Sequence, residues 1–142
     1  MITLLNTIIV KGNFLAVEFH KILLRYWPTS SGQKQSCFTE FLLFSMSKMD
    51  LKHVSSVIKV TLAILNEVIL GDQIRAIESV LDYIIESQKD QWITEHSKRV
   101  VVTLYDSIKE VSMLNWCEKI REKASEALIE LGKLDRKARS EE

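Results

Sequence analysis

The sequence has few residues that interrupt helices and little excess charge. It contains one proline and four glycines in 142 residues, and this scarcity favours long helices joined by short turns. Its two cysteines, Cys37 and Cys117, are far apart, so the sequence predicts buried free thiols rather than a disulfide. The 19 basic and 19 acidic side chains cancel, and basic residues gather only in twos and threes, which argues against a nucleic-acid partner.

No stretch of the sequence is apolar enough to span a membrane. The apolar N-terminal run reaches Val10 but is interrupted by Asn6 and Thr7, whereas a membrane-spanning helix needs about 20 mainly apolar residues. A secretory signal peptide would begin with a basic segment and end at small residues, and this pattern is absent from the sequence. The sequence therefore predicts an intracellular protein, cytoplasmic or nuclear, with no membrane partner.

The residues that could carry chemistry are isolated from one another. His20, His53 and His96 have no second histidine or cysteine at the three- or four-residue spacing of a helical metal site. Glycine-rich phosphate loops and the G-x-S-x-G nucleophile motif are absent from the sequence. We therefore expect no catalytic residue, no cofactor and no metal site. An enzyme or cofactor-binding bundle is the least favoured class.

Two apolar helix faces recur at a displacement of 47 residues. The first face, Val54, Val57, Thr61 and Ile64, returns as Val101, Leu104, Ile108 and Val111, and the second, Ile77, Val80, Leu81 and Ile84, returns as Ala124, Ala127, Leu128 and Leu131. The members of each face follow helical spacing, so we expect the second face to be buried against the first. A pair of helices used twice is typical of a solenoid. A degenerate earlier copy precedes them, with its second helix out of phase.

The chain is predicted to form one helical-repeat domain over residues 1–134, followed by a disordered polar tail over residues 135–142. Pro28 ends an early helix, and the polar residues 28–36 predict a loop. Asp50, Asp72 and Asn115 are then predicted to cap the three helices that follow them. The expected helices cover residues 2–11, 14–27, 37–46, 51–70, 73–86, 95–113 and 116–134. A buried strand is the alternative for the first segment, because Ile8, Ile9 and Val10 are β-branched.

The repeat resembles the armadillo and HEAT class, whose repeats run about 40–47 residues. The residues that carry the resemblance are the two pairs of faces, which lie between Asp50 and Leu134. The fold expected from it is all-α, a short α-solenoid of stacked helical hairpins. The resemblance implies a non-catalytic scaffold or adaptor that binds protein partners, and a fragment or short isoform of a longer solenoid also fits it.

A compact helical bundle is the alternative fold. In it, an apolar groove would accept an amphipathic helix from a partner. The two folds differ in their contacts, because a solenoid packs neighbours in sequence whereas a bundle brings the first helix against the last.

An apolar stripe at the N-terminus is the predicted partner-binding site. It consists of Leu4, Leu5, Ile8 and Ile9. A terminal repeat normally carries a polar outer face, so an apolar one predicts stacking on a protein partner or on a second copy of the chain.

The three tryptophans lie at the ends of predicted helices. Trp27 precedes Pro28, Trp92 follows a polar connection, and Trp116 follows Asn115. Packing between repeats is the favoured interpretation, because an indole can bury its ring and keep its N–H near an acceptor. The alternative is an aromatic side chain that faces a partner.

Overall fold

The computed structural model describes residues 13–28, 32–86 and 90–140, and all regular structure among them is helical. The seven helices of this part are α2 (Asn13–Arg25), α3 (Gly32–Lys48), α4 (Leu51–Ile69), α5 (Ile74–Ile85), α6 (Gln91–Glu95), α7 (Ser97–Leu114) and α8 (Glu118–Ser140). Helix α4 starts directly after Asp50, as predicted, although the Asp50 side chain makes no capping hydrogen bond. The prediction of an all-α protein is confirmed.

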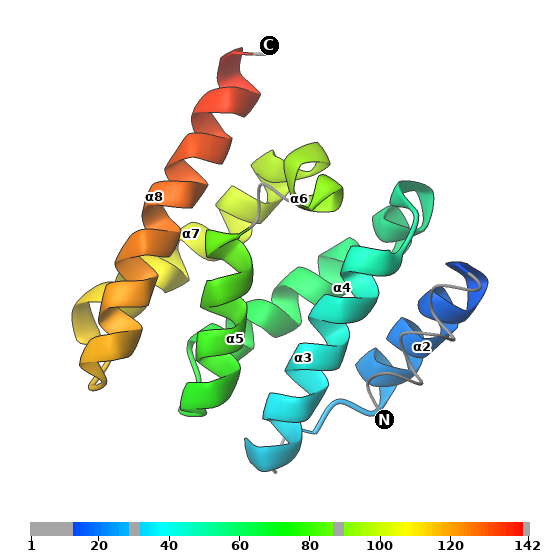
Figure 1. Cartoon of the computed structure of the whole chain (residues 1–142), viewed down its shortest axis with the longest axis horizontal. Helices are drawn as coiled ribbons and strands as arrows, with labels where there is room; N and C mark the ends of the chain where they lie inside the picture. The colour runs from blue at the N-terminus through cyan, green and yellow to red at the C-terminus, as the bar shows by residue number, and fades with distance from the viewer. Residues whose placement is uncertain (1–12, 29–31, 87–89, 141–142) are drawn as a thin grey trace.

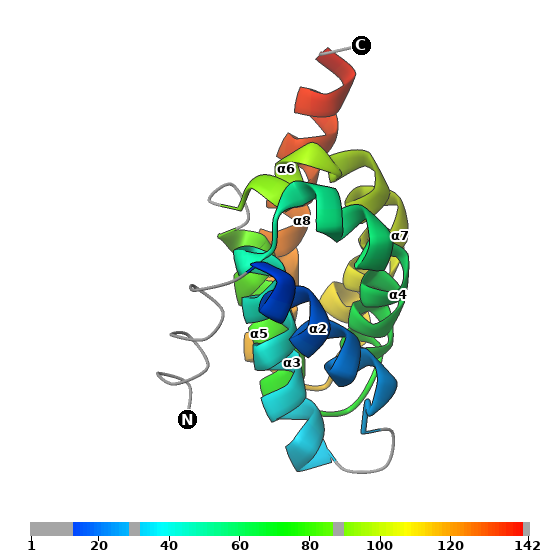
Figure 2. The ribbon, with the colours of Figure 1, turned by 90° about the vertical axis from the view of Figure 1, so that its right-hand side faces the viewer.

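Six of these helices form three hairpins that stack side by side (Figure 1). The hairpins are α2–α3, α4–α5 and α7–α8, and the short α6 connects the second to the third. Their first helices, α2, α4 and α7, pack in one layer, and their second helices, α3, α5 and α8, pack in another. Figure 2 shows α3 and α5 on one side of the stack, with α4 and α7 on the other.

Contacts between neighbouring hairpins hold the stack together. Helix α2 packs on α3 and α4, whereas α8 packs on α5 and α7. Helices α2 and α8 lie at opposite ends of the molecule (Figure 1). A closed bundle would bring these two helices together, so the structure has the solenoid arrangement and the bundle alternative is wrong.

The apolar faces expected to pair do form the core of the second hairpin. Ile77, Val80, Leu81 and Ile84 on α5 are all buried, and α5 packs against α4. Helix α4 contributes a wide buried face made of Val54, Val57, Ile58, Thr61, Leu62, Leu65, Val68 and Ile69. Burying one leucine or isoleucine side chain contributes about 1.5–3 kcal/mol relative to leaving it in water. This face therefore supplies much of the stability of the stack.

The repeat register differs from the predicted one in the first layer. A displacement of 47 pairs buried Val54 with half-buried Val101. Five buried residues of α4 instead match five buried residues of α7 at a displacement of 43: Val54 with Ser97, Val57 with Val100, Thr61 with Leu104, Leu65 with Ile108, and Val68 with Val111. The two registers differ by about one helical turn. An apolar pattern looks nearly the same after one turn, so the sequence alone did not separate them.

Polar bonds link the hairpins at a regular interval. The His20 Nε2 atom lies 2.7 Å from the Thr61 Oγ1 atom and so joins α2 to α4. The Ser107 hydroxyl donates to the Asn66 amide oxygen and joins α7 to α4. In the second layer, Lys123 Nζ donates to an Asp82 carboxylate oxygen at 2.8 Å. Each bond joins residues 41 positions apart, which lies within the repeat length of the armadillo and HEAT class.

Two segment predictions need correction. Helix α3 begins at Gly32, so the second half of the predicted 28–36 loop is helical. There, the Gln35 Nε2 atom donates to the Pro28 carbonyl oxygen at 2.8 Å and supports the first turn of the helix. Helix α8 continues through Ser140, where the sequence predicted a disordered tail from residue 135. No helix in the described part is long and apolar enough to cross a membrane.

Candidate protein-binding surface

The predicted binding stripe, Leu4, Leu5, Ile8 and Ile9, lies outside the described residues. A different apolar surface is present in the described part. The turns within the three hairpins lie along one edge of the stack, at the bottom of Figure 2. Large apolar side chains at or beside these turns are exposed to solvent: Tyr26 (65%), Leu70 (49%), Met113 (64%), Leu114 (72%) and Trp116 (75%). We call these five residues the turn ridge.

The first turn is fixed at both ends, and Tyr26 stays outside. The Tyr26 N–H donates to the Ile22 carbonyl oxygen at 3.0 Å. The next residue, Trp27, packs edge-on against Phe38 of α3, with 6.1 Å between ring centroids. This aromatic pair anchors α2 to α3, and it leaves the preceding tyrosine on the surface.

The second turn is short and tightly bonded. The Gly71 N–H donates to the Val68 carbonyl oxygen at 3.1 Å. A Cβ atom on Gly71 would lie 3.3 Å from that same oxygen, so the glycine permits the close approach. Gln73 is the N-cap of α5, one residue after the predicted cap Asp72. Because the backbone beside it is hydrogen-bonded in this way, the Leu70 side chain stays half-exposed at the end of α4.

The third turn carries three of the five ridge residues, Met113, Leu114 and Trp116. The Asn115 Oδ1 atom accepts the Cys117 N–H at 2.9 Å across the turn, but the last helix begins only at Glu118, so Asn115 is not its N-cap as predicted. The Arg121 Nη1 atom donates to the Asn115 carbonyl oxygen at 2.6 Å. The backbone is therefore held from both sides while the apolar side chains project outward.

The tryptophans differ in their environment. Trp92 is buried, and its Nε1 atom donates to the Tyr83 hydroxyl at 2.8 Å. Trp27 is half-buried against Phe38. Both pack against another helix, but Trp27 does so within the first hairpin, so the predicted packing between repeats is not confirmed for it. The prediction of packing is wrong for Trp116, which is three-quarters exposed and so fits the alternative of an aromatic that faces a partner.

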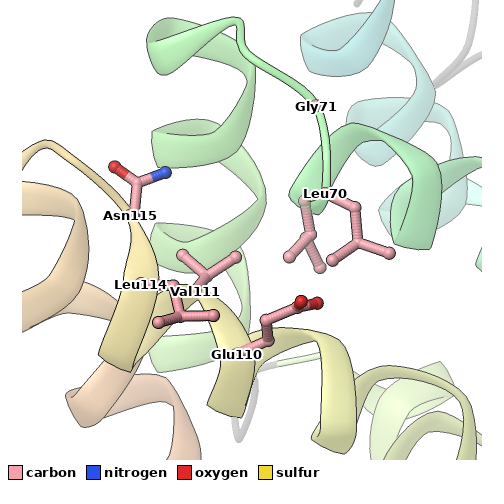
Figure 3. Close-up of a pocket in the computed structure, with 7 residues that line it drawn as sticks. Leu70, Gly71, Glu110, Val111, Leu114 and Asn115 are labelled. Atoms are coloured by element: carbon pink, nitrogen blue, oxygen red, sulfur yellow. The ribbon is translucent and has the colours of Figure 1, made fainter.

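A cleft interrupts the turn ridge between the ends of α4 and α7 (Figure 3). Its volume is about 350 Å³. Leu70 and Gly71 line one side, and Glu110, Val111, Leu114 and Asn115 line the other. Figure 3 shows the Glu110 carboxylate directed across the cleft toward the end of α4. The cleft thus combines apolar walls with one negative charge.

The titratable groups of the core serve packing. Burial lowers the pKa of His20 to about 4, and both of its ring nitrogens bond to core hydroxyls. Burial also raises the pKa of Tyr83, whose hydroxyl holds Trp92. Among the described residues, no group of three histidine, cysteine or acidic side chains could hold a metal ion.

An ion-pair network lies on the second layer. Lys123 contacts Asp82 at 2.8 Å and Glu78 at 3.3 Å, and Lys119 contacts Glu78 at 3.3 Å. The bond to Asp82 is the main cause that raises the pKa of Lys123. Burial acts to raise the pKa of Glu78, but the two lysines outweigh it and lower that pKa. These pairs fasten α8 to α5.

The cysteines are free, as predicted, but they are not buried. Cys37 is exposed on α3 and Cys117 is half-buried beside the third turn. Helical spacing placed both among apolar residues, but Cys117 only packs against the edge of the core and Cys37 lies on the surface.

Comparison with known protein families identifies the chain. A family described as protein phosphatase 2A regulatory B subunit (B56 family) matches residues 1–142. The chain belongs to the B56 family. A comparison with curated proteins gave no match. B56 proteins are regulatory subunits with a helical-repeat fold, which agrees with the three stacked hairpins. The resemblance to the armadillo and HEAT class therefore holds at the level of the repeat class.

Sequence reasoning missed the turn ridge of this B56-family chain. Leu70, Leu114 and Trp116 occur at helix ends in the sequence, where they look like residues that close the core. The available signal was their position next to Gly71 and Asn115, because a residue in a turn has less protein around it than one within a helix.

Proposed function

We propose that the chain is a non-catalytic part of a protein phosphatase 2A regulatory subunit and binds the phosphatase along the turn ridge. The observation that carries the proposal is the exposure of five large apolar side chains at or beside hairpin turns that share one edge of the stack, in a B56-family chain. Several large apolar side chains exposed on one edge are typical of protein interfaces.

The chemistry of the ridge supports a protein partner. Tryptophan and tyrosine are enriched among the residues that dominate binding energy, and the ridge has one of each, Trp116 and Tyr26. Their backbones are fixed by turns, so little conformational entropy is lost when a partner orders them. An intracellular location, cytoplasmic or nuclear, follows from such a partner.

The test is sedimentation velocity of the full chain with purified phosphatase 2A that lacks a regulatory B subunit. The proposal expects a faster-sedimenting complex at micromolar concentrations. It also expects altered dephosphorylation of a phosphopeptide by the phosphatase, and no hydrolysis by the chain alone. Two separate boundaries at all concentrations would contradict binding, and hydrolysis by the pure chain would contradict the non-catalytic role.

We also propose that the N-terminal stripe binds a protein, either a partner or a second copy of the chain. Leu5→Asp combined with Ile9→Asp should then remove any concentration-dependent association while the helix content is kept. The control is Glu126→Gln, an exposed substitution on α8. A wild-type chain that remains monomeric, together with a double variant that unfolds, would assign the stripe to the chain's own core.

A further inference from the structure

The lining of the cleft between the ends of α4 and α7 carries one negative charge. Glu110 is the charged residue that lines it, and no lining residue is basic. Glu110 makes no ion pair within the described ranges 13–28, 32–86 and 90–140. Its exposed carboxylate faces the opposite wall of the cleft (Figure 3). A cation from outside the chain would therefore meet an unpaired carboxylate there.

The end of α4 adds to this negative charge. Helices α4 and α7 both finish at the cleft, and neither has a basic residue in its last turn. The C-terminus of a helix carries a partial negative charge of about half a unit, which favours a nearby cation by about 0.3–1 kcal/mol. The field at the end of α4 therefore has the same sign as Glu110, whereas the Arg121 guanidinium offsets the field at the end of α7.

The end of α4 lacks a donor that the other hairpins supply. In the first hairpin, Gln35 of α3 donates to the Pro28 carbonyl oxygen. In the third, Arg121 of α8 donates to the Asn115 carbonyl oxygen, so α7 already has a cation at its end. In the second turn, the Gln73 side-chain amide donates to the Asp72 carboxylate. Among the described residues, no side chain donates a hydrogen bond to a backbone carbonyl oxygen of residues 70–73.

The cleft walls suit a long aliphatic stem. Leu70 and Leu114 stand on opposite sides and are both largely exposed, while Val111 is buried at the base. Lysine and arginine side chains lay their methylene groups on apolar surface and keep the charged head at a polar site. The cleft offers apolar walls for such a stem and hydrogen-bond acceptors, Glu110 and the end of α4, for the charged head.

We propose that this cleft binds a lysine or arginine side chain of a protein partner, with its stem between Leu70 and Leu114 and its charged head between Glu110 and the end of α4. The inference rests on the proposed role of the turn ridge in protein binding, because the cleft lies within that ridge. It adds the chemical class of the partner group that is recognised.

The test uses short peptides and the isotope-labelled full chain in nuclear magnetic resonance titrations. The probes are acetylated and amidated Ala-Leu-Arg-Leu-Ala, the same peptide with lysine, and the same peptide with citrulline, which is neutral and shaped like arginine. The arginine and lysine peptides should shift the amide signals of Leu70, Gly71 and Glu110. The citrulline peptide should bind at least about tenfold more weakly, since it lacks the charge.

Glu110→Gln should weaken the binding of the arginine peptide by about threefold to tenfold and leave the binding of the citrulline peptide unchanged. The matched control is Glu126→Gln, which removes the same charge from an exposed position on α8 and should change nothing. Equal binding of arginine and citrulline peptides, equal effects of the two substitutions, or no saturable shift up to about 10 mM peptide would each overturn the proposal.

These outcomes are separate from those of the proposed function, because the peptide titrations contain no phosphatase. If the peptides fail but the chain still sediments with phosphatase 2A, the charge preference of the cleft is wrong and the ridge proposal stands. If the peptides bind as expected but no complex forms with the phosphatase, the cleft serves another basic partner.

Discussion

The pH dependence of stability should report on His20, the polar centre of the first two hairpins. Its Nδ1 atom lies 2.6 Å from Ser45 Oγ on α3, and its Nε2 atom lies 2.7 Å from Thr61 Oγ1 on α4. The side chain is fully buried. A neutral imidazole donates one hydrogen bond and accepts one. One of the two hydroxyls therefore accepts from the ring, and the other gives its proton to the ring in place of its bond to the carbonyl oxygen of Leu42 or Val57.

Burial lowers the pKa of His20 to about 4 from an ordinary value of 6.5. The folded state therefore binds a proton less readily than the unfolded state. The contribution of His20 to stability is fully present above pH 6.5 and is lost as the pH falls from 6.5 toward 4. Between pH 7.5 and 4.5, the loss from this residue alone amounts to about 2.5 kcal/mol.

Urea unfolding of the wild type and of His20→Gln at these two pH values is the assay. The glutamine variant keeps a hydrogen-bonding side chain but does not titrate, so the difference between the proteins isolates His20. The wild type should lose about 2 kcal/mol more than the variant on acidification. Equal losses in both proteins would refute the reasoning, because they would mean that the pKa of His20 is the same in the folded and unfolded states.

Three further substitutions test the packing between helices. Leu81→Ala should lower the free energy of unfolding by about 2–5 kcal/mol in urea, since it opens a cavity between α5 and α4; a loss of a few tenths would contradict its burial. Tyr83→Phe removes the acceptor of the Trp92 N–H, and thermal unfolding should reveal a loss of about 1–2 kcal/mol. Lys123→Met should cost less than about 1 kcal/mol, an effect that disappears in high salt because the partner Asp82 is half-exposed.

The helices of the second hairpin could be predicted well from the sequence. Val57, Leu81 and Ile84 follow helical spacing, and Asp50 and Gly71 mark where the helix between them begins and ends. Periodicity of this kind is a local property, so the sequence displays it directly. The choice between solenoid and bundle also came from a local observation, the recurrence of one pair of faces.

The remaining features depend on packing in three dimensions. The predicted register between α4 and α7 differs from the observed one by one helical turn, because burial is decided by neighbouring helices and not by spacing alone. The polar residues 32–36 form the first turn of α3. Their preference for a turn is outweighed because Phe38 of the same helix packs against Trp27. The exposure of Trp116 could not be predicted, since an apolar residue at a helix end fits the core and the surface equally well.

The most direct test of the account is the dissociation constant of the chain for phosphatase 2A that lacks a regulatory B subunit, compared between Trp116→Ala and Ile129→Ala. Both substitutions truncate a large exposed apolar side chain, but only Trp116 belongs to the turn ridge. We predict that Trp116→Ala weakens binding by at least about tenfold and that Ile129→Ala leaves it unchanged. Equal affinities for the two variants and the wild type would contradict binding through the turn ridge.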